Sequence, residues 1–449
     1  MQFRRRRTLR TAIIASAALG LIAGGSVLAL TSGSGAQESL ALSAAQTSTG
    51  CAAAWSSSAV YTAGNQASES GINYTANWWT QGNNPATNNG GSGSGQPWTS
   101  DGACTGGSGS GSSPSPSPSP SASSSSGSGT GTTGSVSGVL FSPYKDVTIN
   151  MNWNTDQMQS AVEGSDLPVV GTGSLVSTYI PKLPAITLAF ATGSCGSENW
   201  GGVAGASFAA ENVPQLQAAG LKYVVSTGGE DGVFTCDSTA DMESFIARYA
   251  SPDLVGIDFD IEGGQTQSEI QQLVDAAAGA QSEYPNLQFS FTLATLGASD
   301  GSYGGVNSLG NEVVEAVLGS SLKNYVINLM TMDFGSASSS VCVVVSGACE
   351  MGQSAIQAVE NLEHTYGIPA GKIAVTPMIG LNDNTAETFT TADVDTLTSY
   401  AVANGLAGLH FWSLDRDTPC NDDYASPTCN SISSTTPLEY TKRFLSDGA

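Results

Sequence analysis

The chain has 449 residues, of which 12% are charged, and its 38 acidic side chains far outnumber its 14 basic ones. Five of the basic residues lie within the first 36 positions, so the remainder holds nine basic against 38 acidic residues, a net charge of −29. This charge argues against nucleic acid as a partner, because binding nucleic acid requires a basic surface that neutralises phosphates. A neutral polymer as partner is compatible with this net charge.

The N-terminus has the order of a secretory signal peptide over residues 1–36. Arginines at positions 4–7 and 10 precede an apolar stretch from Thr11 to Leu30, and small residues follow up to Ala36. The apolar stretch nearly reaches the roughly 20 residues that span a bilayer, so an uncleaved anchor is the alternative, although its Gly and Ser content favours cleavage. The run Arg6-Arg7-Thr8-Leu9-Arg10 leaves the Sec and twin-arginine routes both open. Either route predicts a secreted, extracellular protein without membrane association after signal removal.

The rest of the chain divides into three segments of different composition. Residues 46–104 form a small aromatic-rich segment that ends at Cys104. Residues 105–138 are almost entirely Gly, Ser, Thr and Pro, a composition that cannot bury apolar surface and predicts a flexible, partly extended linker. From residue 139 to residue 449 the composition is that of an ordinary globular protein, and this length suffices for one large domain.

The large segment repeats a short apolar run, a Gly/Ser/Asp-rich loop and a longer helical stretch. Strands that alternate with helices predict a parallel sheet, and eight such units predict a (β/α)8 barrel, with an open doubly wound sheet as the alternative. The eight runs are Val147–Trp153, Ile186–Ala191, Tyr223–Ser226, Leu254–Ile261, Gln288–Ala294, Tyr325–Met332, Ile373–Met378 and Gly408–Trp412.

The eight cysteines suit an exported chain, because oxidising conditions allow an even number to pair completely. No C-x-x-C spacing points to zinc or redox chemistry, and no metal site is predicted. Six of the cysteines follow predicted strands, in loops at the face where a barrel builds its active site. Spacing alone leaves the connectivity open. The expected pairs are Cys51 with Cys104, Cys195 with Cys236, Cys342 with Cys349, and Cys420 with Cys429.

The fourth run carries an unusual row of acids. Side chains alternate between the two faces of a strand, so Asp258, Asp260 and Glu262 share one face and the apolar residues between them share the other. Neighbouring acids in a shielded pocket disfavour each other's ionisation, so at least one should keep its proton near neutral pH. Glu262 is the outermost and the longest of the three, and it is therefore the expected general acid. A solvated or metal-binding acidic edge is the alternative.

The segment Gly256-Ile-Asp-Phe-Asp-Ile-Glu262 resembles the Asp-x-x-Asp-x-Asp-x-Glu signature of family 18 glycoside hydrolases, the chitinases and their relatives, and Ser226-Thr-Gly-Gly229 is similar to that family's Ser-x-Gly-Gly motif. The resemblance covers residues 139–449. It implies a retaining mechanism in which the substrate's own N-acetyl group attacks the anomeric carbon. Glu262 would protonate the leaving oxygen, Asp260 would hold the acetamido group, and Asp258 would tune Asp260. No cofactor is implied.

Further positions match or depart from the family pattern. Val255 stands where the first Asp of the signature is usual, and Met330-Thr-Met-Asp-Phe334 is similar to the family's Met-x-Tyr-Asp segment with Met332 in place of Tyr. Ser226 could support Asp258 without touching substrate. The resemblance gives as substrate-binding residues Ser226, Met330, Met332, Asp333 and Trp412. Cleft-lining and merely solvated roles are equally compatible with the loop residues Glu230, Asp231, Asn382 and Asp383.

Length predicts the shape of the cleft. Only 29 residues separate Met378 from Gly408, which leaves no room for the extra α+β insertion of some family members. We therefore expect an open groove that suits attack within a polymer chain.

The small segment resembles the family 5/12 carbohydrate-binding modules of chitinases in the pattern Ala54-Trp55, Tyr61-x-x-Gly64 and Tyr74-x-Ala-Asn-Trp-Trp-Thr-Gln81. This resemblance implies a small all-β module whose binding platform is Tyr61, Trp78 and Trp79, with Trp55 and Trp98 mainly structural. The alternative is that all six large aromatic residues are core.

Together these features predict a secreted, monomeric, endo-acting chitinase whose partner is chitin or a chitooligosaccharide. An endo-β-N-acetylglucosaminidase acting on N-glycans and a non-catalytic chitin-binding lectin are the alternatives.

Overall fold

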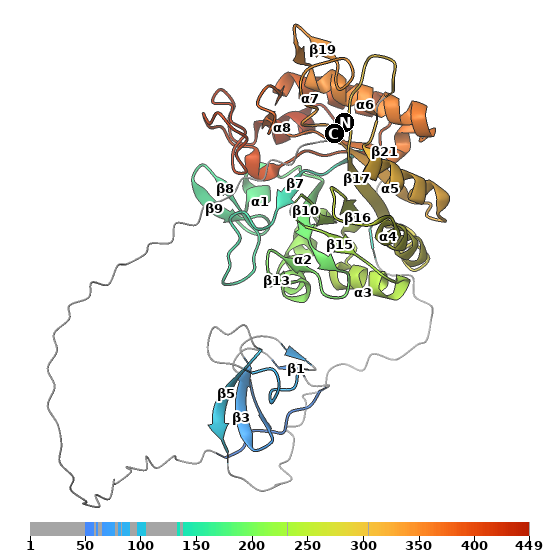
Figure 1. Cartoon of the computed structure of the whole chain (residues 1–449). Coiled ribbons are helices and arrows are strands. Elements are labelled where there is room, and N and C mark those ends of the chain that lie inside the picture. The colour runs from blue at the N-terminus through green and yellow to red at the C-terminus, as the bar shows by residue number, and fades with distance from the viewer. Residues whose placement is uncertain are drawn as a thin grey trace, which may run out of the picture. The chain divides into compact units, whose positions relative to one another are not determined.

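The computed structural model describes residues 50–57, 60–61, 65–76, 80–81, 83–89, 97–104, 133–134, 138–230, 232–303 and 305–448. The chain divides into two compact units, one within residues 1–123 and one from residue 124 onward (Figure 1). The predicted signal peptide, most of the predicted linker, and Trp78, Trp79 and Asp231 lie outside the described residues.

The large unit is built on a parallel sheet with helices around it, coloured from green to red in Figure 1. Its strands, in chain order, are β6 (Leu140–Phe141), β7 (Tyr144–Asp146), β10 (Ala185–Ala191), β14 (Lys222–Gly228), β16 (Leu254–Asp260), β17 (Gln288–Ala294), β18 (Tyr325–Met330), β21 (Ile373–Thr376) and β24 (Gly408–Leu409). Its helices are α1 (Leu175–Tyr179), α2 (Gly205–Ala219), α3 (Thr239–Tyr249), α4 (Gln267–Ala280), α5 (Ser308–Gly319), α6 (Met351–Tyr366), α7 (Thr391–Asn404) and α8 (Glu439–Ser446).

The connecting loops carry short two-stranded pairs and two turns of 3-10 helix. These are β8 (Gln159–Val162) with β9 (Ser165–Pro168), β11 (Gly193–Ser194) with β15 (Phe234–Thr235), β12 (Asn199–Trp200) with β13 (Val203–Ala204), β19 (Val344–Val345) with β20 (Ala348–Cys349), β22 (Gly380–Leu381) with β23 (Thr388–Phe389), η1 (Ala370–Lys372) and η2 (Leu414–Arg416).

The sheet closes on itself through its first strand. β6 pairs with β24 and β7 pairs with β10, both in parallel, and the two pieces are separated only by residues 142–143. Pro143 has no N–H to donate, but its carbonyl oxygen accepts a 3.0 Å hydrogen bond from Thr187 N. Tyr144 N, on the other side, donates to Phe411 O at 3.1 Å. β6 and β7 are therefore one interrupted strand, and the eight-stranded barrel predicted from the sequence is confirmed in place of the open sheet.

One predicted strand was wrong. Val147–Trp153 forms turns, and the first strand lies before it, in residues 140–146. Pro143 and Lys145 hide that strand in the sequence, because a proline and a charge interrupt its apolar run. The apolar residues of the turn have other reasons: Val147 and Met151 are buried beneath the loops, whereas Trp153 is 56% exposed. The other seven runs fall on barrel strands, within a few residues at their ends.

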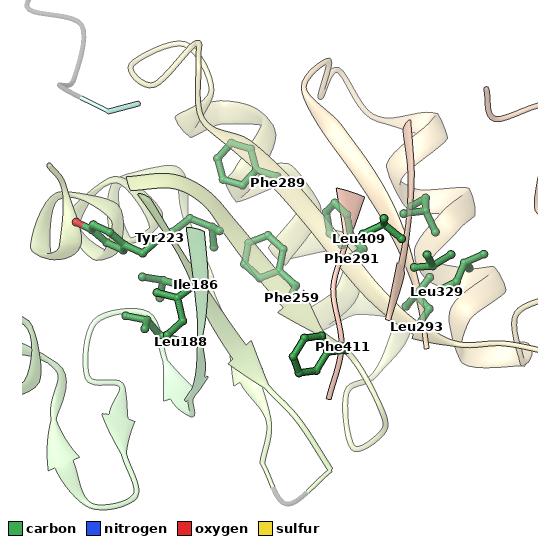
Figure 2. Close-up of a cluster of buried hydrophobic side chains, with 14 of the residues drawn as sticks. Ile186, Leu188, Tyr223, Phe259, Phe289, Phe291, Leu293, Leu329, Leu409 and Phe411 are labelled. Atoms are coloured by element: carbon green, nitrogen blue, oxygen red, sulfur yellow. The ribbon is translucent and has the colours of Figure 1, made fainter. Parts of the chain in front are cut away.

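The main core lies between the barrel and the helices. The outward-facing residues of β16, Ile257 and Phe259, are buried, and the Phe259 ring lies 5.3 Å from that of Phe291 on the next strand. Figure 2 shows these rings among the aliphatic side chains of neighbouring strands. The helices bury apolar faces against the barrel, as α4 shows. This helix starts with a capping box between Thr266 and Glu269, and it buries an apolar stripe on the barrel side.

The small unit is a compact β-structure. β2 (Gln66–Glu69), β3 (Ile72–Ala76) and β5 (Trp98–Ala103) form an antiparallel sheet, and β1 (Val60–Tyr61) pairs with β4 (Thr80–Gln81). Trp98 is fully buried, and the half-buried Tyr61 packs edge-on against it with ring centroids 5.0 Å apart. A core this small depends on covalent closure, which the Cys51–Cys104 disulfide provides.

The remaining disulfides join the cysteines paired from the sequence, all in loops that follow barrel strands: Cys195–Cys236, Cys342–Cys349 and Cys420–Cys429. Within the described part of the chain, no helix combines the length and apolarity that a membrane span requires.

Candidate active site

A cleft of about 390 Å³ opens at the carboxyl ends of the barrel strands. Loops and strand ends from most of the barrel contribute to it, which is the usual construction of a site on this fold. The lining residues are Tyr144, Phe190, Glu230, Asp260, Glu262, Thr292, Met330, Met332, Asp333, Thr376, Met378, Asp383 and Trp412.

Asp258 lies below this cleft, inside the barrel, and is 1% exposed. Four hydroxyl groups donate to its carboxylate. Ser226 and Tyr144 bond Oδ2 at 2.6 and 2.9 Å, and Ser290 and Thr292 bond Oδ1 at 2.6 and 2.7 Å. Burial raises the pKa of Asp258, and these four donors act in the opposite direction. The carboxyl is thus fully satisfied by protein groups and has no oxygen left for a ligand.

Asp260, two residues further along the same strand face, has the opposite environment. It is 5% exposed, and no donor in the described part of the chain reaches its Oδ1. Burial raises the pKa of Asp260 well above its usual range, and the charges of Glu262 and Asp258 raise it further. A buried carboxyl oxygen without a partner costs free energy unless a ligand supplies a donor.

Glu262 follows the end of β16 and is exposed at the cleft. Ile261 N, just before it, donates to Thr292 O at 3.1 Å, so the backbone keeps the strand direction as far as the residue that precedes the acid. Glu262 therefore reaches the mouth of the cleft from a fixed backbone, with Asp260 beneath it.

The Ser226-Thr-Gly-Gly229 segment fits tightly against β16. A Cβ on Gly228 would lie 2.1 Å from Asp260 O, and a Cβ on Gly229 would lie 2.8 Å from the Phe190 ring; both glycines have positive φ. The motif therefore serves two purposes. Ser226 anchors Asp258, and the two glycines let the chain pass close to Asp260 at Gly228 and close to the Phe190 ring at Gly229.

Aromatic rings form one wall of the cleft. Trp412 stacks on Phe190 with ring centroids 5.6 Å apart and an interplanar angle of 17°. Tyr144 lies 6.2 Å from both rings. Flat apolar faces beside carboxyl groups match a sugar, which has apolar C–H faces and polar edges.

The structure places the predicted site residues in two layers. Six line the cleft directly: Asp260, Glu262, Met330, Met332, Asp333 and Trp412. Asp258 and Ser226 lie beneath them, and Ser226 is fully buried and donates only inward, to Asp258. Of the loop residues, Glu230 and Asp383 line the cleft, whereas the fully buried Asn382 donates to the carbonyl oxygens of Met378 and Gly380.

Several cleft residues were missed in the sequence. Tyr144 was overlooked because the first strand was misplaced, and Phe190 because it sits in a wholly apolar run. Thr292 had a usable signal, since Ser290 and Thr292 alternate with apolar residues on β17 just as the acids do on β16.

The departure at Val255 lies at the other end of β16. Val255 is buried among Leu140, Ala185 and Val224, where a register shift separates Tyr223 from Val224 in the pairing with β16. This position is remote from the cleft. Met332, in contrast, lies in the cleft wall, so the usual tyrosine hydroxyl is missing from the site itself.

One cluster has the spacing of metal ligands. It comprises Cys420, Asp422 and Cys429, but both sulfurs are committed to the Cys420–Cys429 disulfide and are not thiolate ligands.

Comparison with known proteins relates this geometry to other chains. No protein-family model matches the chain. A probable bifunctional chitinase/lysozyme of Escherichia coli is 25% identical over 414 residues, which cover 82% of this chain and 45% of that protein. An endoglucanase of Microbulbifer sp. is 42% identical over 53 residues, 12% of this chain and 10% of that protein. The chain thus spans less than half the length of the curated relatives it matches.

Solved structures show the fold. The catalytic domain of a hyperthermophilic chitinase from Pyrococcus furiosus superposes with a TM-score of 0.50 and 23% identity, over 70% of this chain and 98% of that one. At this identity the likeness establishes the architecture alone, a barrel of the kind found in chitinases.

Proposed function

We propose that this protein is a secreted chitinase that hydrolyses β-1,4 bonds between N-acetylglucosamine units with retention of configuration. The observation that carries the proposal is the buried Oδ1 of Asp260, which no donor among the described residues reaches. It lies beside Glu262 in a cleft walled by Tyr144, Phe190 and Trp412. A sugar acetamide supplies the missing donor through its N–H group.

The arrangement of the two acids defines the chemistry. With its N–H bonded to Asp260, the acetamide directs its carbonyl oxygen at the anomeric carbon. This carbonyl oxygen takes the place of an enzyme nucleophile. Glu262 protonates the departing glycosidic oxygen and later removes a proton from the attacking water. The ring formed from the acetamide is positively charged, and the Asp260 carboxylate stabilises it electrostatically.

Asp258 supports this step from below. Burial, and then the charges of Glu262 and Asp258, raise the pKa of Asp260, so the three acids together retain more protons near neutrality than three independent carboxyls would. The four hydroxyl donors around Asp258 fix its position under Asp260. Met332 brings no hydroxyl, so among the described residues that line the cleft the hydroxyl groups are those of Tyr144, Thr292 and Thr376.

One curated relative and one solved structure support this proposal. One is named a probable chitinase/lysozyme, and the barrel has the fold of a chitinase catalytic domain. Only the short β22–β23 hairpin and α7 separate β21 from β24, so no additional domain is inserted between these two strands. An open cleft suits attack within a chain.

The small unit is proposed as a chitin-binding module. Its described residues form a compact β-structure closed by the Cys51–Cys104 disulfide, and Tyr61 contributes a half-buried ring. Tyr61, Trp78 and Trp79 would form its binding platform. Held by the linker of residues 105–138, such a module would raise the concentration of the barrel at an insoluble polymer. Its disulfide and the other three agree with export guided by residues 1–36, after which the enzyme works as a monomer.

The experiment compares the full chain with Glu262→Gln on colloidal chitin and on a high-mannose glycopeptide. The chitinase proposal expects soluble N-acetylglucosamine oligomers from chitin, nothing from the glycopeptide, and a loss of about a hundredfold or more in Glu262→Gln with chitin binding retained. Release of the glycan would identify an endo-β-N-acetylglucosaminidase instead. Binding of chitin without hydrolysis by the unmodified chain would identify a lectin.

A further inference from the structure

The turn that carries Asp333 is held by a hairpin to which the proposed mechanism gives no role. Asp333 follows β18 and lines the cleft. The β22–β23 hairpin follows β21, the neighbouring barrel strand, and its tip, residues 382–387, contacts residues 333–335 through side chains. Two loops that are 50 residues apart in sequence thus form one wall of the site.

The turn has a backbone conformation that needs support. Asp333 has a φ of 51°, in the left-handed region, and Gly335 follows with a φ of 100°. A residue with a side chain holds such a conformation only where its surroundings over-determine it. Asp333 is therefore held in its place in the cleft wall by its neighbours.

Glu387 supplies most of that support. Its carboxylate is 1% exposed and accepts hydrogen bonds from Phe334 N at 3.0 Å, from Gly335 N at 2.8 Å and from Asn384 Nδ2 at 2.6 Å. Two of these donors are the backbone amides that directly follow Asp333. A buried carboxylate with three N–H donors is a strong and directional anchor, since bonds to an ionised acceptor are the stronger kind.

Asn384 connects this anchor to the acid itself. Its backbone N–H donates to Asp333 Oδ1 at 2.8 Å, and its Nδ2 donates both to Glu387 and to Gly335 O, the latter at 2.7 Å. Asn382 accepts a longer bond of 3.4 Å from Asp333 N. The carboxyl of Asp333 and the turn that bears it are thus bonded to the same hairpin.

We propose that Glu387, together with Asn384, is a positioning residue that sets the Asp333 carboxyl in the wall of the cleft against the bound sugar. This inference rests on the proposed function, because Asp333 affects the reaction only if a sugar occupies the cleft. Glu387 lines no part of the cleft and acts through Asp333 alone.

A double-mutant cycle tests the proposal on the full chain, with a p-nitrophenyl glycoside of N-acetylchitobiose as the probe. Glu387→Gln places an NH2 group against N–H donors, and we expect kcat to fall about tenfold or more with a smaller change in KM, since small misplacements in a site are costly. In an Asp333→Asn background the same substitution should change kcat by less than about twofold, because coupled residues are not additive.

A matched control separates positioning from loss of stability. Asp417 is another carboxylate that is 1% exposed with three neutral donors, namely Tyr440 N, Thr441 N and Thr441 Oγ1, at α8 and outside the cleft lining. Asp417→Asn should lower Tm and leave kcat unchanged. Should Glu387→Gln not fold, Asn384→Ala enters the same cycle with the same expectation.

The possible failures are distinct. If the unmodified chain does not cleave the glycoside or chitin, the proposed function fails and this inference with it. If the unmodified chain is active and the effect of Glu387→Gln is as large in the Asp333→Asn background as without it, the proposed function stands and the positioning role is overturned. An effect of Glu387→Gln on Tm alone overturns the positioning role as well.

Discussion

On the acid face of β16, the lower and the upper buried carboxyl groups have opposite hydrogen-bonding environments. Asp258, in the lower part, accepts four hydroxyl hydrogen bonds. Asp260, one pleat above, has an oxygen that no donor in the described part of the chain reaches. Burial raises the pKa of both. The two residues are identical, lie on one strand and differ only in their partners.

The difference indicates that the hydrogen-bonding capacity of Asp258 is used within the fold, whereas Asp260 keeps an oxygen to which a ligand can donate. Strands β7 and β14 contribute one hydroxyl group each to Asp258 and β17 contributes two, so that carboxyl links three strands of the barrel. Around Asp260 the same strands provide a tight backbone approach at Gly228 and no donor for Oδ1. Sites that bind ligands commonly sacrifice stability in this way.

Removing the charge from the upper acid should give the largest effect. We expect Asp260→Asn to lower kcat on chitooligosaccharides by about two to three orders of magnitude, because it removes the electrostatic partner of the developing positive charge. The same change should raise Tm at neutral pH, since an amide is less costly to bury than a carboxylate with an oxygen that no described donor reaches. Steady-state kinetics and thermal unfolding of one preparation measure both. An active or a less stable Asp260→Asn would contradict the contrast between the two acids.

Removing the lower acid should act on stability. Asp258→Ala leaves four hydroxyl groups inside the barrel without their acceptor, and we expect it to cost about 3 kcal/mol in the free energy of unfolding. Asp258→Asn, which retains the shape and one acceptor oxygen, serves as the control and should cost less. Urea unfolding at neutral pH measures both. If Asp258→Ala is as stable as the unmodified chain, the hydroxyl groups do not depend on Asp258.

Local patterns made the acid strand predictable. Alternation along Leu254–Glu262 is a property of one strand, and it correctly separated the acids from the residues that pack under the helices. Seven of the eight barrel strands also followed from local runs, and closure into a barrel was inferred from the repeated strand–helix units. The residues on each face of a strand can be predicted from its own sequence, before its neighbouring strands are known.

Other contacts of the site, including one partner of Asp258, could not be predicted in the same way. Tyr144 meets Asp258 across 114 positions of sequence, and it does so only because the barrel closes through a strand interrupted by Pro143. The Glu387 hairpin has no periodic pattern at all, since its role lies in bonds to the backbone of another loop. Contacts created by closure and by loops belong to the tertiary structure, and one sequence contains no local signal for them.

The smallest expected effect is the pH dependence of stability that the upper acid, Asp260, produces. A carboxyl whose pKa is raised on folding binds its proton more tightly in the folded state, so its contribution to stability is full below the ordinary pKa of an aspartate and is lost as pH rises through the folded value. Burial, and then the charges of Glu262 and Asp258, raise the pKa of Asp260. The unmodified chain should therefore lose stability relative to Asp260→Asn as pH rises from acid to neutral. Thermal unfolding of both proteins across that range measures the gap in Tm. A gap that is constant with pH would mean that Asp260 titrates in the folded protein as it does in the unfolded chain, and a gap that narrows as pH rises would mean that an unrecognised donor stabilises its ionised form.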